Sequence, residues 1–127
     1  MATIVLAKPV PGDKTWTRQS VIADFEKVNI RVGVIVAVED FPRARNPSYK
    51  VTVDFGPEIG QRQSSAQLTN YTHEELIGRQ IVAVINFAPK NIAGFMSECL
   101  ILGVPLADGK VSLLSPTRTA VIGGKMF

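Results

Sequence analysis

The chain has 127 residues, of which 46% are hydrophobic and 20% are charged; this is the composition of an ordinary globular domain and excludes a disordered chain. No uncharged apolar run approaches the roughly 20 residues that a membrane-spanning helix needs, so we expect no membrane insertion. The net charge of +3 permits a nucleic-acid partner without demanding one, since no segment is a basic block.

The first part of the chain, residues 1–22, is expected to form an irregular N-terminal extension, because its prolines and glycine interrupt any long element. Regular structure is expected to begin near Asp24, and residues 23–127 are expected to form one domain. The only tryptophan, Trp16, lies in the extension and is expected to pack on the body of the protein or on a partner chain.

Two features favour a reduced, cytoplasmic protein. The apolar residues 4–7 have no basic residue before them, so they do not form a signal peptide. The single cysteine, Cys99, excludes an intrachain disulfide and lies in an apolar stretch, where we expect a buried thiol.

Three strands are predicted in the first half of the chain. Apolar residues, many of them β-branched, alternate from residue 28 to residue 39, and Gly33 in the middle is expected to mark a bulge or a sharp coil. Residues 49–55 alternate in the same way, and residues 62–68 form a more polar third strand. The two prolines within residues 39–48 predict a loop.

A short helix is predicted next, because Thr72 and Glu75 have the spacing of a capping box and Gly78 can end the helix. The nearly continuous apolar run of residues 80–87 predicts a strand buried on both faces. Pro89 to Phe95 is expected to be a loop. A fifth strand is expected over residues 98–104, and weaker strand-like pieces near residues 111–114 and 120–122.

This order of elements predicts the fold class. Three strands, one short helix and two strands are the order of an OB-fold, an all-β five-stranded barrel whose capping helix lies between strands three and four. We therefore expect such a barrel with N- and C-terminal extensions. A generic antiparallel sandwich is the alternative, but five strands are few for two well-covered sheets.

The sequence does not indicate catalysis. The only histidine, His73, is expected on the solvated surface of the short helix, where the local sequence supplies no catalytic partner. One histidine and one cysteine cannot form an ordinary zinc site. Gly123-Gly124-Lys125 lacks the other residues of a phosphate-binding loop. We therefore expect a protein that is not an enzyme and has no metal or cofactor.

Several spaced motifs run from residue 28 to residue 103. They are Asn29-Ile30-Arg31-Val32-Gly33, Ala44-Arg45-Asn46-Pro47-Ser48-Tyr49-Lys50, Ser64-Ser65-Ala66-Gln67, Gly78-Arg79-Gln80, Asn86-Phe87-Ala88-Pro89-Lys90 and Ser97-Glu98. In this order they resemble the free-standing tRNA-binding domain family, most of all its CsaA-type members, which are described as protein-export chaperones. The same domain is appended to some methionyl- and phenylalanyl-tRNA synthetases.

The resemblance implies an OB-fold and a symmetric homodimer, in which the C-terminal segment and often the N-terminal one complete the contact. It also implies a nucleic-acid face at Asn86, Lys90 and Ser97. From the residues alone, the Asn86 amide either contacts a ligand or ties down a loop, and Ser97 either binds phosphate or caps a turn. Cys99 and Leu100 depart from the Gly and Met that the wider family often has after Ser-Glu, which puts the geometry at the tRNA end in doubt.

Further cations and aromatic residues are candidates for binding. Four basic residues are expected to add phosphate contacts on the outer strand faces or loops, or to serve only as soluble surface: Arg31, Arg45, Lys50 and Arg62. A groove for unfolded polypeptide could form from residues in or beside loops, unless these side chains only close the barrel ends: Phe41, Tyr49, Phe87, Phe95 and Met96.

The first hypothesis is a homodimeric, non-catalytic tRNA-binding protein. The second, which is compatible with the first, is a chaperone that holds unfolded or export-bound polypeptides. The alternative is an accessory dimerisation or tRNA-delivery module for an aminoacyl-tRNA synthetase.

Overall fold

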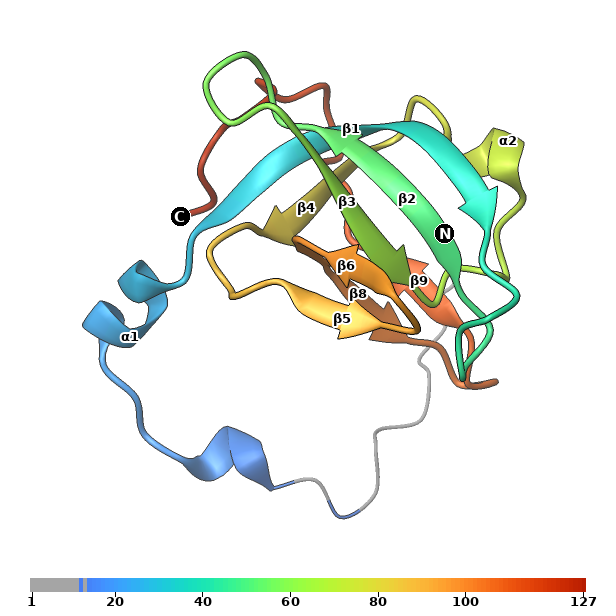
Figure 1. Ribbon diagram of the computed structural model, residues 1–127. Helices are drawn as coiled ribbons and strands as arrows, with labels where there is room; N and C mark the ends of the chain where they lie inside the picture. The colour runs from blue at the N-terminus through green and yellow to red at the C-terminus, as the bar shows by residue number, and fades with distance from the viewer. Residues whose placement is uncertain (1–11, 13) are drawn as a thin grey trace, which may run out of the picture.

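Within Gly12 and residues 14–127, the residues that the structure describes, the computed structural model contains nine strands and two short α-helices (Figure 1). The helical elements are η1 (Thr15–Thr17, a 3₁₀ turn), α1 (Ile22–Lys27) and α2 (His73–Leu76). The strands are β1 (Ile30–Asp40), β2 (Tyr49–Asp54), β3 (Gln61–Ala66), β4 (Gln80–Val84), β5 (Lys90–Ile92), β6 (Phe95–Ser97), β7 (Leu100–Ile101), β8 (Gly103–Pro105) and β9 (Val111–Leu113). No helix in this part of the chain is long and apolar enough to cross a membrane. The expectations for residues 1–11 lie outside the described residues.

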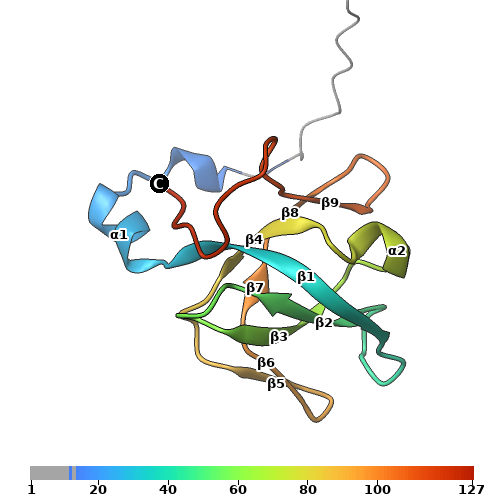
Figure 2. The ribbon, with the colours of Figure 1, turned by 90° about the horizontal axis from the view of Figure 1, so that it is seen from above.

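Five strands form one antiparallel sheet in the order β3-β2-β1-β4-β7, which curls into a nearly closed barrel (Figure 2). This confirms the predicted all-β, five-stranded barrel of the OB type, with α2 between β3 and β4. The two outer strands, β3 and β7, are joined through the segment before β7. There the backbone N–H of Glu98 donates to the carbonyl of Gln63 at 2.8 Å.

The bulge expected at Gly33 lies elsewhere. The register of β1 against β2 shifts between Ile35 and Ala37. Gly33 has a different role, because a Cβ at this position would collide with Val53 and would lie 2.8 Å from the ring of Phe55. The glycine therefore allows the barrel to close tightly around Phe55, and the coil that reverses the faces of β1 comes a few residues later.

The strand β1 contributes to two separate apolar clusters. Beyond Gly33 it packs Ile35 into the interior of the barrel, with Val51, Val53 and Phe55. Before Gly33 it contributes to a second cluster on the outside of the sheet, which consists of Ile30, Val32, Val82 and Val84. The near-continuous apolar run of residues 80–87 is explained by this arrangement, because β4 faces both clusters.

The region expected to be a loop after β4 contains a hairpin, so that expectation was wrong. β5 and β6 pair with Lys90 opposite Ser97 and Ile92 opposite Phe95. Ala93 and Gly94 form the two-residue turn, both with positive φ (48° and 87°), which matches the twist of a hairpin. The Asn91 side chain closes the turn by accepting from the N–H of Gly94 at 2.8 Å.

The expected fifth strand is divided in two, and one tail strand was misplaced. β7 pairs with β4, whereas β8 pairs with β9 in a separate hairpin. Gly103 allows β8 to pair closely with β9, because any side chain at this position would place its Cβ only 2.8 Å from the Val111 side chain. Residues 120–122 are not a strand. Instead, the C-terminal segment pairs with β1 at one point after residue 122, through an isolated antiparallel bridge between Arg31 and Lys125.

The helix α2 packs on the barrel through the buried Leu76, whereas α1 has no buried residue. The capping box of α2 is confirmed: the Thr72 hydroxyl accepts from the N–H of Glu75 at 3.1 Å, and the Glu75 carboxylate accepts from the N–H of Thr72 at 3.0 Å. The bond that the carboxylate accepts from the Thr72 backbone, followed by the Thr72 side chain, lowers the pKa of Glu75. The helix α1 was not predicted. It lies beside the C-terminal end of the chain in both views (Figure 1, Figure 2).

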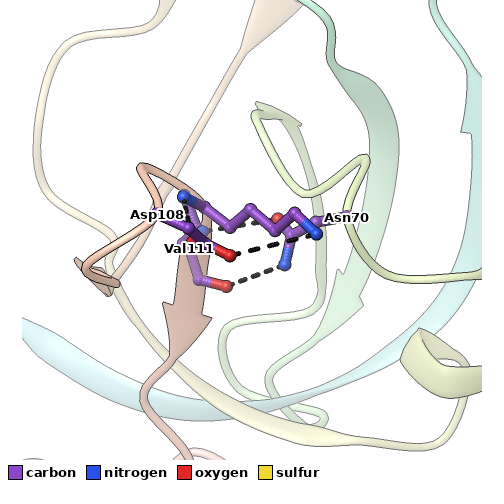
Figure 3. Close-up of polar contacts among 4 residues, drawn as sticks. Asn70, Asp108 and Val111 are labelled. Carbon is purple, nitrogen blue, oxygen red and sulfur yellow. Dashed lines mark hydrogen bonds and ion pairs between the residues drawn. The ribbon is translucent and has the colours of Figure 1, made fainter.

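The Asn70 side chain helps to fasten the β8–β9 hairpin to the body (Figure 3), together with the Tyr71 hydroxyl, which accepts from the N–H of Leu113 at 3.1 Å. The amide of Asn70 donates to the carbonyl of Val111 at 3.0 Å and accepts from its N–H at 3.4 Å. The hairpin turn is held by Asp108, which accepts from the N–H of Lys110 at 3.0 Å. Asn70 thus takes the place of a neighbouring strand, because it supplies both hydrogen bonds that a backbone partner would make.

Candidate nucleic-acid interface

A cleft of about 400 Å³ opens beside the barrel seam, between the end of β3, the loop from β4 to β5 and the segment that joins β6 to β7. This volume is in the range of small-ligand sites, roughly 300–1,000 Å³. We refer to this site as the seam cleft. Its walls combine polar and apolar side chains: Ser65, Gln67, Phe87, Ala88, Lys90, Ile92, Ser97, Glu98, Cys99 and Leu100.

Two of the residues that the resemblance assigned to RNA, Lys90 and Ser97, lie together in the seam cleft. They are opposite each other in the β5–β6 hairpin. Lys90 is exposed, and no ion pair engages it among the described residues. The Ser97 hydroxyl accepts from the N–H of Ser65 at 3.0 Å. Lys90 is therefore free to meet an anion, whereas Ser97 also fastens the hairpin to β3.

The wall of the cleft depends on Glu98, which belongs to the Ser97-Glu98 motif and for which no role was predicted. Its carboxylate accepts from the N–H of Gln63 at 3.1 Å, while its own N–H donates to the Gln63 carbonyl. The Gln63 side chain in turn donates to the carbonyl of Met96 at 3.0 Å. The Ser-Glu pair therefore closes the seam by side-chain hydrogen bonds where a continuous strand ladder is absent.

Asn86 ties down the chain. Its carbonyl oxygen accepts from the N–H of Asn29 at 2.9 Å, and its amide nitrogen donates to the carbonyl of Lys27 at 2.8 Å. These bonds anchor the loop after β4 to the segment between α1 and β1. The sequence left open whether Asn86 contacts a ligand or ties down a loop. The structure shows that it ties down the loop, and a contact between Asn86 and RNA stays a prediction.

Arg31 and Arg62 are both directed to backbone carbonyls. Arg62 donates to the carbonyl of Ile85 at 2.6 Å, and Arg31 donates to the carbonyl of Gly123 at 3.0 Å and to the Asn29 side chain at 2.8 Å. Both side chains are half-buried. They hold the loop after β4 and the C-terminal segment in place, and they leave fewer donors for phosphate than fully exposed arginines would.

Lys50 and Arg45 have different surroundings. The Lys50 ammonium lies 5.0 Å from the ring centroid of Phe41 and 5.3 Å from that of Phe95, so two cation–π contacts hold it. Arg45 is exposed on the loop between β1 and β2. The lining of the seam cleft therefore includes Lys90 but none of the four other candidate cations, Arg31, Arg45, Lys50 and Arg62.

The five residues expected to form a peptide groove do not all line one hollow, because Phe41 and Tyr49 line a hollow beside the β1–β2 loop and Phe87 lines the seam cleft. Phe41 is buried, and its ring packs edge-on against Phe95 at 5.5 Å. Tyr49 donates its hydroxyl to the carbonyl of Tyr71 at 2.9 Å. Phe87 and Met96 are exposed, at 52% and 42%. Phe41, Phe95 and Tyr49 thus stabilise the barrel, and Phe87 belongs to the seam cleft.

His73 has a partner that the local sequence did not reveal. Its Nε2 lies 2.9 Å from Asp40 Oδ1, and its ring packs edge-on against Tyr49. Asp40 comes from the end of β1, far away in the sequence. The expectation of a merely solvated histidine was therefore incomplete.

Cys99 forms part of the inner wall of the seam cleft and is buried, as expected. Burial raises the pKa of its thiol to about 11, because the thiolate would lose its hydration. At neutral pH the group is a neutral, apolar part of the wall.

The family model described as "Putative tRNA binding domain" matches residues 30–125. The chain belongs to the tRNA-binding domain family. The match extends from the first residue of β1 to the C-terminal segment that pairs with it, so the family unit is the barrel together with its tail.

Solved structures and sequence relatives agree with this membership. The CsaA chaperone protein of Picrophilus torridus is 48% identical, with a TM-score of 0.82 over 86% of this chain and 100% of that one. The chaperone CsaA of Bacillus anthracis is 46% identical. Its TM-score is 0.80, and the match covers 87% of this chain and 100% of that one. A methionine–tRNA ligase of Methanococcus vannielii is 39% identical over 80% of this chain, but the chain spans only 15% of that enzyme.

Proposed function

We propose that this protein is a non-catalytic tRNA-binding protein of the CsaA type that acts as a homodimer. The observation that supports it most directly is the family match over a barrel whose seam cleft presents the unpaired cation Lys90. tRNA offers phosphates to such a cation and unpaired loop bases to such a cleft, whereas its helices hide their base edges in a narrow groove.

The groups that could perform catalysis have other roles here. His73 pairs with Asp40, and the Cys99 thiol is buried, which raises its pKa and keeps it protonated at neutral pH. The ligase relatives carry much more chain than this domain, since it spans 15% of the Methanococcus enzyme. The proposal therefore gives this chain binding and no part of their aminoacylation chemistry.

A large apolar surface at one end of the barrel supports the homodimer. A groove of about 440 Å³ lies between the outer cluster of the sheet and the C-terminal segment, lined by residues that include Val32, Val82 and Val121. Val121 is 79% exposed and Ile22 of α1 is 76% exposed, and Phe127 is fully exposed. Such a continuous apolar surface is typical of a subunit contact. A twofold pairing would place two seam clefts on one particle.

A second function, holding unfolded or export-bound polypeptides, is favoured by the two neighbours named as CsaA chaperones. Exposed apolar side chains such as Met96 and Leu100 offer contacts for such a client. The alternative of an accessory module for a synthetase follows from the ligase relatives. We place all of these activities in the cytoplasm, where tRNA and nascent chains occur together.

The test is a titration of total tRNA at several salt concentrations, with light scattering to report the mass. We expect a dimer whose affinity falls with salt by a slope of roughly 0.7–0.9 for each phosphate contacted. Binding that is undetectable at low salt would overturn the tRNA proposal, and a monomer at micromolar concentration would overturn the dimer. Suppression of client aggregation that persists at high salt would favour the chaperone function.

A further inference from the structure

The seam cleft combines an exposed aromatic ring with unused polar groups. Phe87 lines it and is 52% exposed. The side-chain amide of Gln67 and the ammonium of Lys90 have no hydrogen-bond partner within the described part of the chain. The exposed ring offers an apolar face that a ligand can cover. A ligand that covers the ring would also meet the Gln67 amide and the Lys90 ammonium, so it should carry polar and negatively charged groups.

We propose that the seam cleft receives one unstacked RNA base, with Phe87 as the stacking ring, Gln67 at the polar edge of the base and Lys90 at the adjoining phosphate. This inference rests on the proposed tRNA binding and assigns its base-reading site. It also moves Phe87 from the peptide-binding set, where the sequence placed it, to the RNA-binding set.

The chemistry of the cleft favours a base over a peptide segment. A nucleobase has an apolar face, a polar edge and a phosphate nearby, and the cleft offers a ring, an amide and a cation. Half of its lining residues are polar or charged: Ser65, Gln67, Lys90, Ser97 and Glu98. Stacking on an aromatic ring tolerates every base, because each has a π-face.

Side-chain hydrogen bonds hold both walls of the cleft. The β5–β6 hairpin that carries Lys90 is fastened to β3 by Ser97, and the loop that carries Phe87 is fastened by Asn86. These bonds position the two backbone segments that carry the ring and the cation. A preformed site loses less entropy on binding than a mobile loop would.

The test compares Phe87→Ala with Ile77→Ala, because Ile77 is equally exposed at 51% but lies after α2, outside the cleft. Binding of a short single-stranded oligoribonucleotide and of total tRNA is measured for both variants. We expect Phe87→Ala to weaken oligonucleotide binding roughly tenfold and Ile77→Ala to leave it unchanged. Melting curves of both variants report that the fold is retained.

A second variant reports stacking itself. In a Trp16→Phe background, Phe87→Trp is expected to retain affinity, and its fluorescence should be quenched when the oligonucleotide binds. Ile77→Trp in the same background should show no quenching. The substitution keeps an aromatic ring in the cleft, so a loss of fold cannot explain the result.

The outcomes separate this inference from the function on which it rests. If the unaltered protein binds tRNA and Phe87→Ala binds it equally well, the base site is wrong and tRNA binding stands. If the unaltered protein binds neither RNA, both fail. If Phe87→Ala loses an unfolded polypeptide client but not RNA, the cleft is a peptide site and the inference is overturned.

Discussion

The two surfaces proposed for binding differ in chemistry and in the way they are built. The seam cleft is a mixed, polar site held by side-chain hydrogen bonds of Ser97 and Glu98. The end face, which we define as the surface of Ile22, Phe25, Val121, Met126 and Phe127, consists of exposed apolar side chains of α1 and the C-terminal segment, with the charged Glu26 and Lys125 beside them. A polar cleft suits a soluble, charged ligand, and an apolar face suits a permanent neighbour. The difference predicts that the proposed RNA binding and the proposed pairing of two subunits use separate surfaces and do not compete.

The largest expected effect comes from a charge in the end face. Val121→Asp places a carboxylate from each subunit where the proposed dimer excludes water, which should weaken dimerisation roughly a thousandfold. Light scattering across a dilution series measures this. Ile77→Asp is the control, because it adds the same charge at an exposed site outside the end face. Tight dimers of Val121→Asp would show that the subunits meet elsewhere.

The next effect concerns the apolar wall of the seam cleft. Since the pKa of Cys99 is raised from 9.0 to about 11, the folded protein retains its proton at pH values where the unfolded chain loses it. Stability should therefore be unaffected below pH 9 and should fall between about pH 9 and 11, by roughly 2–3 kcal/mol. Urea unfolding at several pH values measures this. Cys99→Ala should remove that part of the decline; an unchanged decline would assign it to other groups.

A smaller effect is expected at Glu98. Glu98→Ala leaves the N–H of Gln63 without its side-chain acceptor and should cost about 1–2 kcal/mol of unfolding free energy. Glu98→Gln keeps an acceptor oxygen and should cost much less. Denaturant unfolding compares the two. Equal losses would mean that the negative charge, and not the hydrogen bond, holds the seam.

The smallest effect should appear at Lys90. Lys90→Ala removes one phosphate contact, so the slope of the logarithm of tRNA affinity against that of salt concentration should fall by about 0.7–0.9. Lys110→Ala is the matched control, since this lysine lies near Asp108, at 3.9 Å, on the separate β8–β9 hairpin. A slope that falls equally in both variants would place the phosphates over the whole surface.

Local patterns in the sequence were sufficient to predict the barrel. The alternation over residues 49–55 predicted β2, and Thr72 with Glu75 predicted the cap of α2. The β5–β6 hairpin was missed because its strands are only three residues long, although the Ala93-Gly94 turn was a local signal.

The site was less predictable because its contacts are distant in sequence. The partners of Asn86 are 57 and 59 positions away. The contact of Glu98 with Gln63 spans 35 positions, so no periodicity could reveal it. Lys90 and Ser97 were placed by resemblance, and the structure brings them to one cleft. Arg31, Lys50 and Arg62 have the expected residue type, but backbone carbonyls and aromatic rings occupy them.

The seam of the barrel has a consequence for how the molecule opens. Most amide hydrogens of the sheet are locked in ladders that break only when whole strands separate. Those of Gln63 and Ser65 are held by one carboxylate and one hydroxyl, which can rotate away individually. In deuterated water these two protons should exchange ahead of their neighbours on β3. The first breathing motion of the barrel would then widen the site that we assign to a nucleotide.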